Sequence, residues 1–400
     1  GSPMPFSADY HIHSHFSRAT SPQCTLEQLN YWAQLKGITV VGTGDCTHPG
    51  WRKELREQLV PCGNGLYRLR HESVRMTGSV PDLCRAPVFF IITGEISSIF
   101  KRDGRVYKVH SLVCLPDLDS ADRFSEELNK RGNILSDGRP ILGLDPRTIL
   151  ELLLEAHPSG MFIPAHIWTP WFSMLGSKSG FDTVDACFGG GTGEITAVET
   201  GLSSDPPMNW RVSALDRFCL VSNSDLHSPS RLGRNASVFN CDPDYALMRR
   251  ALKKRDKSLY GGTIDLFPEQ GKYHMDGHRK CRVAMPPEQS VRVNGKCPVC
   301  GRPLILGVLH RIHALADRPA GFVPESAMPH RYIVPLADIL AEINRCGRNT
   351  VKVRKQYNAL LEKYGSEQRI LLETPIDDFD CDDEPNLKTA LHNLRTLNVV

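Results

Sequence analysis

Asp9-Tyr10-His11-Ile12-His13 is the stretch of sequence that decides the fold. We predict that it lies on a first β-strand, where alternate side chains point to the same face. The carboxylate of Asp9 and the imidazoles of His11 and His13 can then converge on one point in space. Nitrogen and oxygen donors grouped in this way are typical of Zn, Mn or Fe sites. The stretch therefore predicts a metal site near the start of the chain.

Further residues of the types that bind metals stand at the ends of later apolar runs. The carboxyl ends of the strands of a βα barrel form the mouth that holds its active site, so residues at these ends are expected to meet. Two or three divalent ions (Zn, Mn or Mg) can be held there about 3.5–4 Å apart, and such ions activate a hydroxide for phosphoester hydrolysis. The residues are Asp45 and His48 after 38–41, Glu95 after 88–92, His110 in 107–110, His166 after 161–164, and Asp225 and His227 after 220–221.

Short Val- and Ile-rich runs alternate with helical stretches between residues 6 and 262. Strands that alternate with helices indicate βα units around a parallel sheet, and hence the α/β class. With about seven such strands we expect closure into a (β/α)7 barrel, the catalytic domain, over residues 4–262. The expected helices cover 25–36, 51–59, 120–131 and 146–156.

A second metal site is predicted beyond the barrel. His278 and Cys281 form one pair with two residues between them, and Cys297 and Cys300 form another, with fifteen residues between the two pairs. This spacing is typical of a structural zinc ribbon, which we expect in a zinc-binding domain over residues 263–318. A redox Cys-x-x-Cys pair is the alternative, but no βαβ pattern surrounds it. His274 could replace His278, although the spacing favours His278.

Length and composition indicate an ordinary globular chain of two or three domains, with 400 residues, 40% of them hydrophobic and 23% charged. No apolar run approaches the roughly 18 residues that span a bilayer, so we expect no membrane partner. Residues 1–3, Gly1-Ser2-Pro3, are interpreted as the remnant of a tag. Most of the 13 cysteines stand singly in apolar segments, which indicates reduced thiols. We expect a cytoplasmic, nucleoid-associated monomer.

Basic residues are concentrated in the last third of the chain, although the formal net charge is only +3. Residues 279–318 include eight Lys and Arg but only two acidic residues. Residues 345–369 include seven Lys and Arg and again only two acidic residues. A solvated surface is the alternative, but such clusters bind polyanions, so we expect single- or double-stranded DNA as a partner. Residues 319–400 are predicted to form a mostly helical C-terminal module, basic at first and then acidic over 377–384, with helices over 335–346 and 351–364.

The order of these motifs resembles the polymerase and histidinol phosphatase (PHP) family over about residues 6–262. The resemblance implies a PHP-type distorted barrel with three metal positions. It also implies that Asp9 and Asp45 are ligands or orient the imidazoles. The implied ligand sets are His11, His13, Glu95 and Asp225 for one ion, His48 and His227 for another, and Glu95, His110 and His166 for a third.

The chain departs from many PHP proteins at Phe16-Ser17-Arg18-Ala19-Thr20-Ser21, where an additional Asp or His is common. One metal position is therefore expected to differ. His15 is either a substitute ligand or a residue that caps a loop. Arg18 could instead clamp a phosphate by two parallel hydrogen bonds.

Within the PHP family, the chain is similar to the endonuclease Q family of DNA-repair enzymes. The similarity rests on residues 16–21, 42–49 and 199–205 and on the zinc segment 271–318. It implies a lesion-specific endonuclease that hydrolyses DNA on the 5′ side of uracil, hypoxanthine, xanthine or an abasic site, leaving a 3′-hydroxyl and a 5′-phosphate. The expected catalytic residues are Glu95, Asp225, His227 and Arg18.

Aromatic residues follow His166 at Trp168, Trp171 and Phe172. Beside metal ions they could stack on an extruded base, and packing in the core is the alternative. Ser203 and Asn209, further along the chain, could read the edge of such a base.

Two other functions stay open on the sequence alone. A small-molecule PHP phosphatase would need only the barrel, whereas the added zinc ribbon and basic module favour a polymer substrate. A non-catalytic DNA-binding accessory module would not need so complete a set of ligands. Recruitment by a sliding clamp is also left open.

Overall fold

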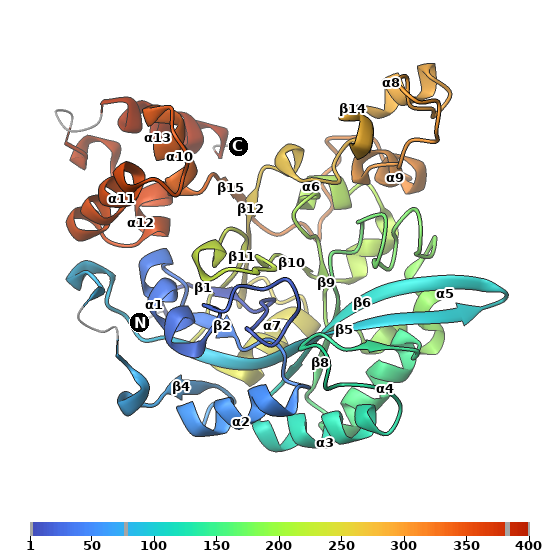
Figure 1. Cartoon of the computed structure of the whole chain (residues 1–400), viewed down its shortest axis with the longest axis horizontal. Helices are drawn as coiled ribbons and strands as arrows, with labels where there is room; N and C mark the ends of the chain where they lie inside the picture. The colour runs from blue at the N-terminus through green and yellow to red at the C-terminus, as the bar shows by residue number, and fades with distance from the viewer. Residues whose placement is uncertain (1–2, 76–78, 381–384, 399–400) are drawn as a thin grey trace.

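The computed structural model describes residues 3–75, 79–380 and 385–398. Gly1 and Ser2 of the expected tag remnant and residues 381–384 of the expected acidic stretch lie outside the described residues. The architecture is mixed α/β. A barrel carries two additions, the zinc-ribbon-like segment and a group of C-terminal helices, which are drawn above the barrel in orange and red in Figure 1.

The barrel is a ring of seven strands, as the sequence predicts. Ladders join the first five, the last two form a parallel pair, and backbone hydrogen bonds such as Ile167 N to Glu199 O connect the two sets. A parallel bridge between Ile12 and Leu226 closes the ring. The strands are β1 (Phe6–Asp9), β2 (Val40–Gly42), β5 (Phe89–Arg102), β6 (Arg105–Leu115), β8 (Met161–Pro164), β9 (Val198–Glu199) and β10 (Leu220–Val221).

The prediction of a parallel sheet is wrong for one strand of the ring, because β6 runs antiparallel to both β5 and β8. The cause is a hairpin in which Arg102 faces Arg105 and only Asp103 and Gly104 form the loop. Both loop residues have positive φ, 51° and 77°, as a type I′ turn requires. An Asp-Gly pair between two strand-forming runs is the sequence signal of this turn, and it explains why the barrel is distorted. Figure 1 shows the hairpin projecting from the barrel.

Other strands extend the barrel sheet on either side of the ring. On the side of β1, the order continues through β11 and β12 to β15, which lies at the edge. The expected boundary at residue 262 falls inside β12, so the sheet continues across it and takes in a strand from the expected C-terminal module. These strands are β11 (Ala236–Phe239), β12 (Tyr260–Leu266) and β15 (His330–Ile333), with β3 (Leu59–Pro61), β4 (Tyr67–Leu69) and β7 (Ile141–Leu142) on the side of β5.

Several helices begin where a side-chain oxygen accepts a hydrogen bond from the first turn. Thr25, Asp117, Asp145 and Asp244 cap four of them in this way. The four helices predicted in the barrel are confirmed within a few residues. No helix among the described residues is both long and apolar enough to cross a membrane. The barrel helices are α1 (Leu26–Lys36), α2 (Pro49–Gln58), α3 (Leu118–Asn129), α4 (Pro146–Ala156), α5 (Val184–Phe188), α6 (Pro206–Asn209) and α7 (Tyr245–Lys253).

The C-terminal helices pack directly on the barrel. Lys36 of α1 and Glu367 of α12 form a buried ion pair, with Nζ 3.3 Å from Oε1. At the sheet edge, the side-chain amide of Asn398 accepts a hydrogen bond from Tyr332 N and donates one to Tyr332 O, at 2.7 and 2.9 Å. The predicted helices over 335–346 and 351–364 are confirmed. The four helices are α10 (Leu336–Asn344), α11 (Val351–Tyr364), α12 (Glu367–Leu372) and α13 (Pro385–Leu397).

The zinc-ribbon-like segment is small and carries its own apolar cluster of Met285, Cys297 and Leu304. Its two strands are antiparallel, and each is three residues long. Its elements are β13 (Asp276–His278), β14 (Val283–Met285), α8 (Pro287–Arg292) and α9 (Val308–Leu315).

Candidate metal centre and the adjoining pocket

Four of the expected ligands form a compact group at the mouth of the barrel. Strand β1 ends at Asp9, and the chain that follows carries His11 and His13 toward Glu95 of β5 and Asp225, which comes soon after β10. One ligand atom from each of the four lies within 4.8 Å of the others. His13 Nε2 is 2.8 Å from Asp225 Oδ1, and His11 Nε2 is 2.9 Å from Glu95 Oε2.

A second group shares Glu95 with the first. It adds His110 of β6 and His166, which follows β8. The ligand nitrogens of these histidines lie 3.3 Å from one another and 3.4 Å from Glu95 Oε2. Glu95 is 1% exposed and lies opposite Leu112 in the β5–β6 hairpin, so the turn that distorts the barrel also sets the distance between Glu95 and His110.

The centre contains buried polar atoms without partners. Neither His11 Nε2 nor Glu95 Oε2 has a hydrogen bond with any described residue. Burial lowers the pKa of His11, but Glu199, Glu95 and Asp225 outweigh it and raise that pKa well above its ordinary value. Burial raises the pKa of Glu95, but His11 and His110 hold it well below its usual range. The site therefore favours positive charge.

Glu199 fixes the tautomer of His11. Both carboxylate oxygens of Glu199 lie 2.9 Å from His11 Nδ1, so this nitrogen keeps its proton and Nε2 is the one that can give up a proton to bind a metal. Nε2 faces the carboxylates of Glu95 and Asp225, at 2.9 and 3.3 Å. A nitrogen and two carboxylates this close need a positive charge between them, which a proton on Nε2 or a metal ion can supply. The donor set therefore fits a divalent metal ion.

The other imidazoles respond to the same charges. Burial lowers the pKa of His13, but its hydrogen bond with Asp225 and the nearby carboxylate of Asp45 raise it to about 9. For His110, burial prevails over the attraction of Glu95 and lowers the pKa to about 4. His110 is therefore neutral at neutral pH, the form in which a histidine binds a metal.

Backbone strain is concentrated at this centre. Asp45, His166 and Asp225 all have positive φ, at 51°, 27° and 50°. Residues other than glycine adopt such angles at a cost of roughly 1–3 kcal/mol, and they do so most often at functional sites. The strain therefore indicates that side-chain placement here has been favoured over stability.

Asp9 and Asp45 do not join either ligand group. The Asp9 carboxylate accepts hydrogen bonds from the backbone N–H groups of Ser224 and Gly233, which ties β1 to the loop that carries Asp225. Asp45 accepts from the hydroxyl of Ser17 at 2.7 Å and lies 3.9 Å from His13 Nδ1. These contacts fit the orienting role, one of the two that the PHP resemblance implies for both acids.

His48 is turned away from both groups. Its Nδ1 accepts a hydrogen bond from Gly50 N at 3.0 Å, and its Nε2 donates one to Leu135 O at 2.9 Å. The structure likewise directs His15 to Glu54, with 2.9 Å between Nε2 and Oε2. Neither histidine belongs to a metal-binding group in the part of the chain that the structure describes.

His227 and Arg18 lie beside the centre rather than in it. The His227 ring stacks on His13 with 4.4 Å between ring centroids, and its Nδ1 donates to Asp225 O at 3.0 Å. Burial and the nearby His13 lower the pKa of His227. The Arg18 side chain is exposed, and its backbone N–H binds Asp137 Oδ1.

The predicted zinc ligands also come together. His278, Cys281, Cys297 and Cys300 form a third group whose ligand atoms lie within 4.8 Å of one another. Burial raises the pKa of Cys297, but the backbone N–H groups of Cys300 and Val299 lower it to about 6, so its thiolate is available near neutral pH. His274 is buried elsewhere, with Nδ1 3.2 Å from Ser203 O.

A large pocket opens beside the second ligand group. Its volume is about 810 Å³, and Trp171, Phe172, Ser203 and Tyr273 line it together with His110 and His166. Trp171 is 45% exposed, and Lys108 Nζ lies 5.1 Å from the center of its ring. Because residues of the barrel, of the chain before the zinc ligands and of the C-terminal module all contribute, the pocket lies where the three parts meet.

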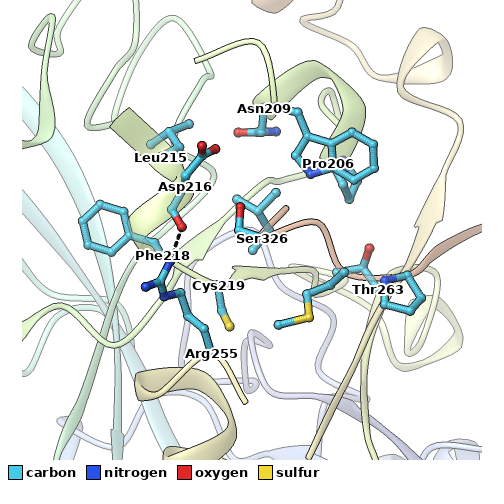
Figure 2. A pocket seen from close by; sticks show the side chains of 13 residues that line it. Pro206, Asn209, Leu215, Asp216, Phe218, Cys219, Arg255, Thr263 and Ser326 are labelled. Carbon is cyan, nitrogen blue, oxygen red and sulfur yellow. Dashed lines mark hydrogen bonds between the residues drawn. The ribbon is translucent and has the colours of Figure 1, made fainter. Parts of the chain in front are cut away.

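Two of the five predicted base-binding residues lie in the core instead. Trp168 is 1% exposed, and its indole N–H donates to Asn209 Oδ1 at 2.7 Å. Asn209 lines a separate cavity of only about 30 Å³, which Figure 2 shows. That volume holds about one water molecule, not a base. Core packing, the alternative left open for Trp168, is what the structure has.

Two residues at the centre were not singled out from the sequence. Glu199 ends an apolar strand just as Glu95 follows one, so the pattern that found Glu95 could have found it. Arg139 lies on an irregular loop, and its Nη1 is 3.3 Å from Glu95 Oε1. No spacing in the sequence indicated that contact.

The model of a protein family described as the MJ0043 C-terminal domain matches residues 335–397. The uncharacterized protein MJ0043 of Methanocaldococcus jannaschii is 31% identical over 219 residues, which make up 53% of this chain and only 27% of that protein. The chain thus spans about a quarter of that relative's length. The uncharacterized protein YqxK of Bacillus subtilis is 30% identical over 345 residues, which cover 82% of this chain and 81% of YqxK.

Two crystal structures resemble the whole chain. Each matches 99% of it at 31% identity with a TM-score of 0.84. One is the lesion-specific endonuclease PfuEndoQ from Pyrococcus furiosus, of which 92% is covered. The other, of which 93% is covered, is endonuclease Q in complex with a 27-mer duplex substrate that has an abasic lesion at the active site.

Proposed function

Because the chain belongs to the endonuclease Q family, we propose that it is a metal-dependent DNA-repair endonuclease. The proposed reaction is hydrolysis of the phosphodiester 5′ to a deaminated base (uracil, hypoxanthine or xanthine) or to an abasic site, which leaves a 3′-hydroxyl and a 5′-phosphate. The observation that carries the proposal is the pair of ligand groups sharing Glu95 beside the 810 Å³ pocket. A pocket of this size suits a nucleotide-sized ligand.

The proposed cofactors are one divalent cation (Zn, Mn or Mg) in each barrel group and one Zn in the Cys and His group. When bound in the barrel, such cations generate a nucleophilic hydroxide and stabilise the leaving oxygen of a phosphoryl displacement. Glu95, which belongs to both barrel groups, would contribute ligand atoms to each position. Glu199 would keep the lone pair of His11 directed at them, since it holds the proton on Nδ1.

The protein residues at the pocket would bind and orient the DNA. Trp171 offers an exposed indole face on which a base can stack, and Phe172 packs on His110 with 4.6 Å between ring centroids. Arg231 and Arg234 line the same pocket and would contact phosphates. Such contacts release counterions, so binding would weaken steeply as the salt concentration rises. Asp225 and His227 would complete the centre on the side of His13.

A nicking assay tests the proposal. Labelled duplexes that carry uracil, hypoxanthine, xanthine, an abasic site or no lesion are incubated with the protein and Mg, Mn or Zn, and the ends are mapped. We expect cuts on the 5′ side of the lesion only. Glu95→Gln should abolish cutting, whereas Glu151→Gln, on the exposed face of α4, should leave it unchanged.

The same assay separates the two alternative functions. Release of phosphate from small phosphomonoesters without any nicking would identify a phosphatase. Tight binding of lesion DNA without hydrolysis in any metal would identify an accessory module. Either result would overturn the proposal.

A further inference from the structure

Arg139 brings a guanidinium group to the carboxylate that both barrel ligand groups share. Its Nη1 lies 3.3 Å from Glu95 Oε1, while Glu95 Oε2 faces His11, His110 and His166. The Arg139 side chain is 29% exposed, and its Nε is buried without a hydrogen-bond partner among the described residues. A guanidinium has five N–H donors, so most of those of Arg139 are left for another ligand.

The loop that carries Arg139 is held firmly against the centre. Asp137 Oδ1 accepts from the backbone N–H of Arg139 at 3.1 Å, and Gly138 N donates to Phe16 O at 3.0 Å. A Cβ atom on Gly138 would come within 2.4 Å of Asp45 Oδ2, so only glycine allows the loop to lie this close. The position of Arg139 is therefore built into the fold.

The same loop withdraws a ligand from the metal position that the PHP resemblance assigns to His48 and His227. That position needs His48, but His48 Nε2 donates to Leu135 O, four residues before Arg139. Its other ring nitrogen is occupied by Gly50 N. The loop that keeps His48 away from the metal centre thus also brings the permanent positive charge of Arg139 to that centre.

We propose that Arg139 takes the place of a third metal ion and binds the scissile phosphate during hydrolysis. This inference rests on the proposed function. A guanidinium can bind two phosphate oxygens by parallel hydrogen bonds and stabilises the charge that develops on them. In the reaction, a bond forms between phosphorus and the water oxygen, and the bond from phosphorus to the 3′ oxygen breaks. Water gives up its proton and the leaving 3′ oxygen gains one, while Arg139 exchanges none.

Substitution of Arg139 provides the test. On a lesion duplex that the wild type cuts, Arg139→Ala should lower kcat by about 10²–10³-fold, the size of effect seen when one such donor is removed. The number of bound metal ions, measured by mass spectrometry, should equal that of the wild type. Added guanidinium should restore part of the kcat of Arg139→Ala. Arg131→Ala, on an exposed side chain at the end of α3, is the matched control.

Three results would overturn the inference. The first is a cutting rate of Arg139→Ala within about threefold of the wild-type rate. The second is a loss of metal ions from Arg139→Ala that accounts for its defect, and the third is the presence of three metal ions in the barrel of the wild type. If the wild type cuts no lesion, the proposed function itself fails. The inference is then decided by titrating the metal-loaded proteins with inorganic phosphate, which Arg139→Ala should bind more weakly than the wild type. Equal phosphate binding would refute it.

Discussion

Both carboxylate oxygens of Glu199 lie 2.9 Å from Nδ1 of His11, and one of them also accepts the backbone N–H of His166. One side chain thus orients a ligand in each barrel group. We predict that Glu199→Gln lowers the affinity of the barrel for metal ions by about 10–100-fold, because the amide keeps an acceptor but loses the charge that makes His11 basic.

Competition with a coloured chelator would measure that affinity. Glu194→Gln, five residues earlier and exposed, is the control. An unchanged affinity in Glu199→Gln would show that the contact with His11 has no role in metal binding.

Replacing His48 or His13 by alanine should have different effects on the number of metal ions bound in the barrel. His13→Ala removes a ligand of the first group, so we predict the loss of a barrel metal ion. His48→Ala should keep all of them, because neither ring nitrogen faces the centre. It should cost only about 1 kcal/mol of stability, through the lost cap of α2. Metal counts by mass spectrometry and unfolding in urea check both outcomes, and an ion lost from His48→Ala would restore the ligand role that the PHP resemblance implies.

Trp168 and Trp171 form a second matched pair. We predict that Trp168→Ala, at a 1% exposed position, lowers the free energy of unfolding by about 3–5 kcal/mol. Trp171→Ala, at a 45% exposed position, should leave stability within about 0.5 kcal/mol. It should instead weaken binding of lesion DNA by about 1–3 kcal/mol, the contribution of one stacked base. Urea unfolding and a fluorescence titration with labelled duplex would separate the two effects, and unweakened binding would exclude Trp171 from the interface.

Asp265 should make stability depend on pH. Burial raises its pKa to about 7, although Thr263 and Ser222 donate hydrogen bonds that oppose this. A carboxyl group whose pKa is higher in the folded state contributes stability below its unfolded pKa of about 4, and this contribution is lost as the pH rises through 7. Asp265→Asn removes that loss. Relative to the wild type, it should gain about 3 kcal/mol of unfolding free energy between pH 5 and pH 8.

Urea unfolding of both proteins at each pH checks this prediction, since other titrating groups cancel in the comparison. The surface substitution Asp242→Asn should show no such trend. A constant difference between the wild type and Asp265→Asn would contradict it.

The barrel and most of its ligands could be predicted because each ligand follows a short apolar run. His11, Glu95 and His166 stand at or soon after such runs, and the ends of barrel strands must meet wherever the ring closes. His48 also satisfied this rule and still points elsewhere, because backbone groups of Gly50 and Leu135 occupy both of its nitrogens. Hydrogen bonds between distant segments leave no periodic trace in a sequence.

Arg139 illustrates the same limit of sequence-based prediction, because it is a residue of the centre that the sequence did not predict. Its contact with Glu95 depends on the path of an irregular loop, and neither residue spacing nor composition encodes that path. Trp168 and Trp171 illustrate a milder case. Three positions apart on one loop, they could be recognised as a base-binding pair or as core, but only the fold decides which side chain is exposed.

The amide of Asn398 covers the outer edge of β15, where it bonds both backbone groups of Tyr332. An uncovered strand edge offers its N–H and C=O groups to any other chain that can extend beside it. A version of the protein that ends before residue 398 would therefore be prone to self-association through β15. Loss of such a shortened protein from solution on storage could be mistaken for a folding defect of the barrel.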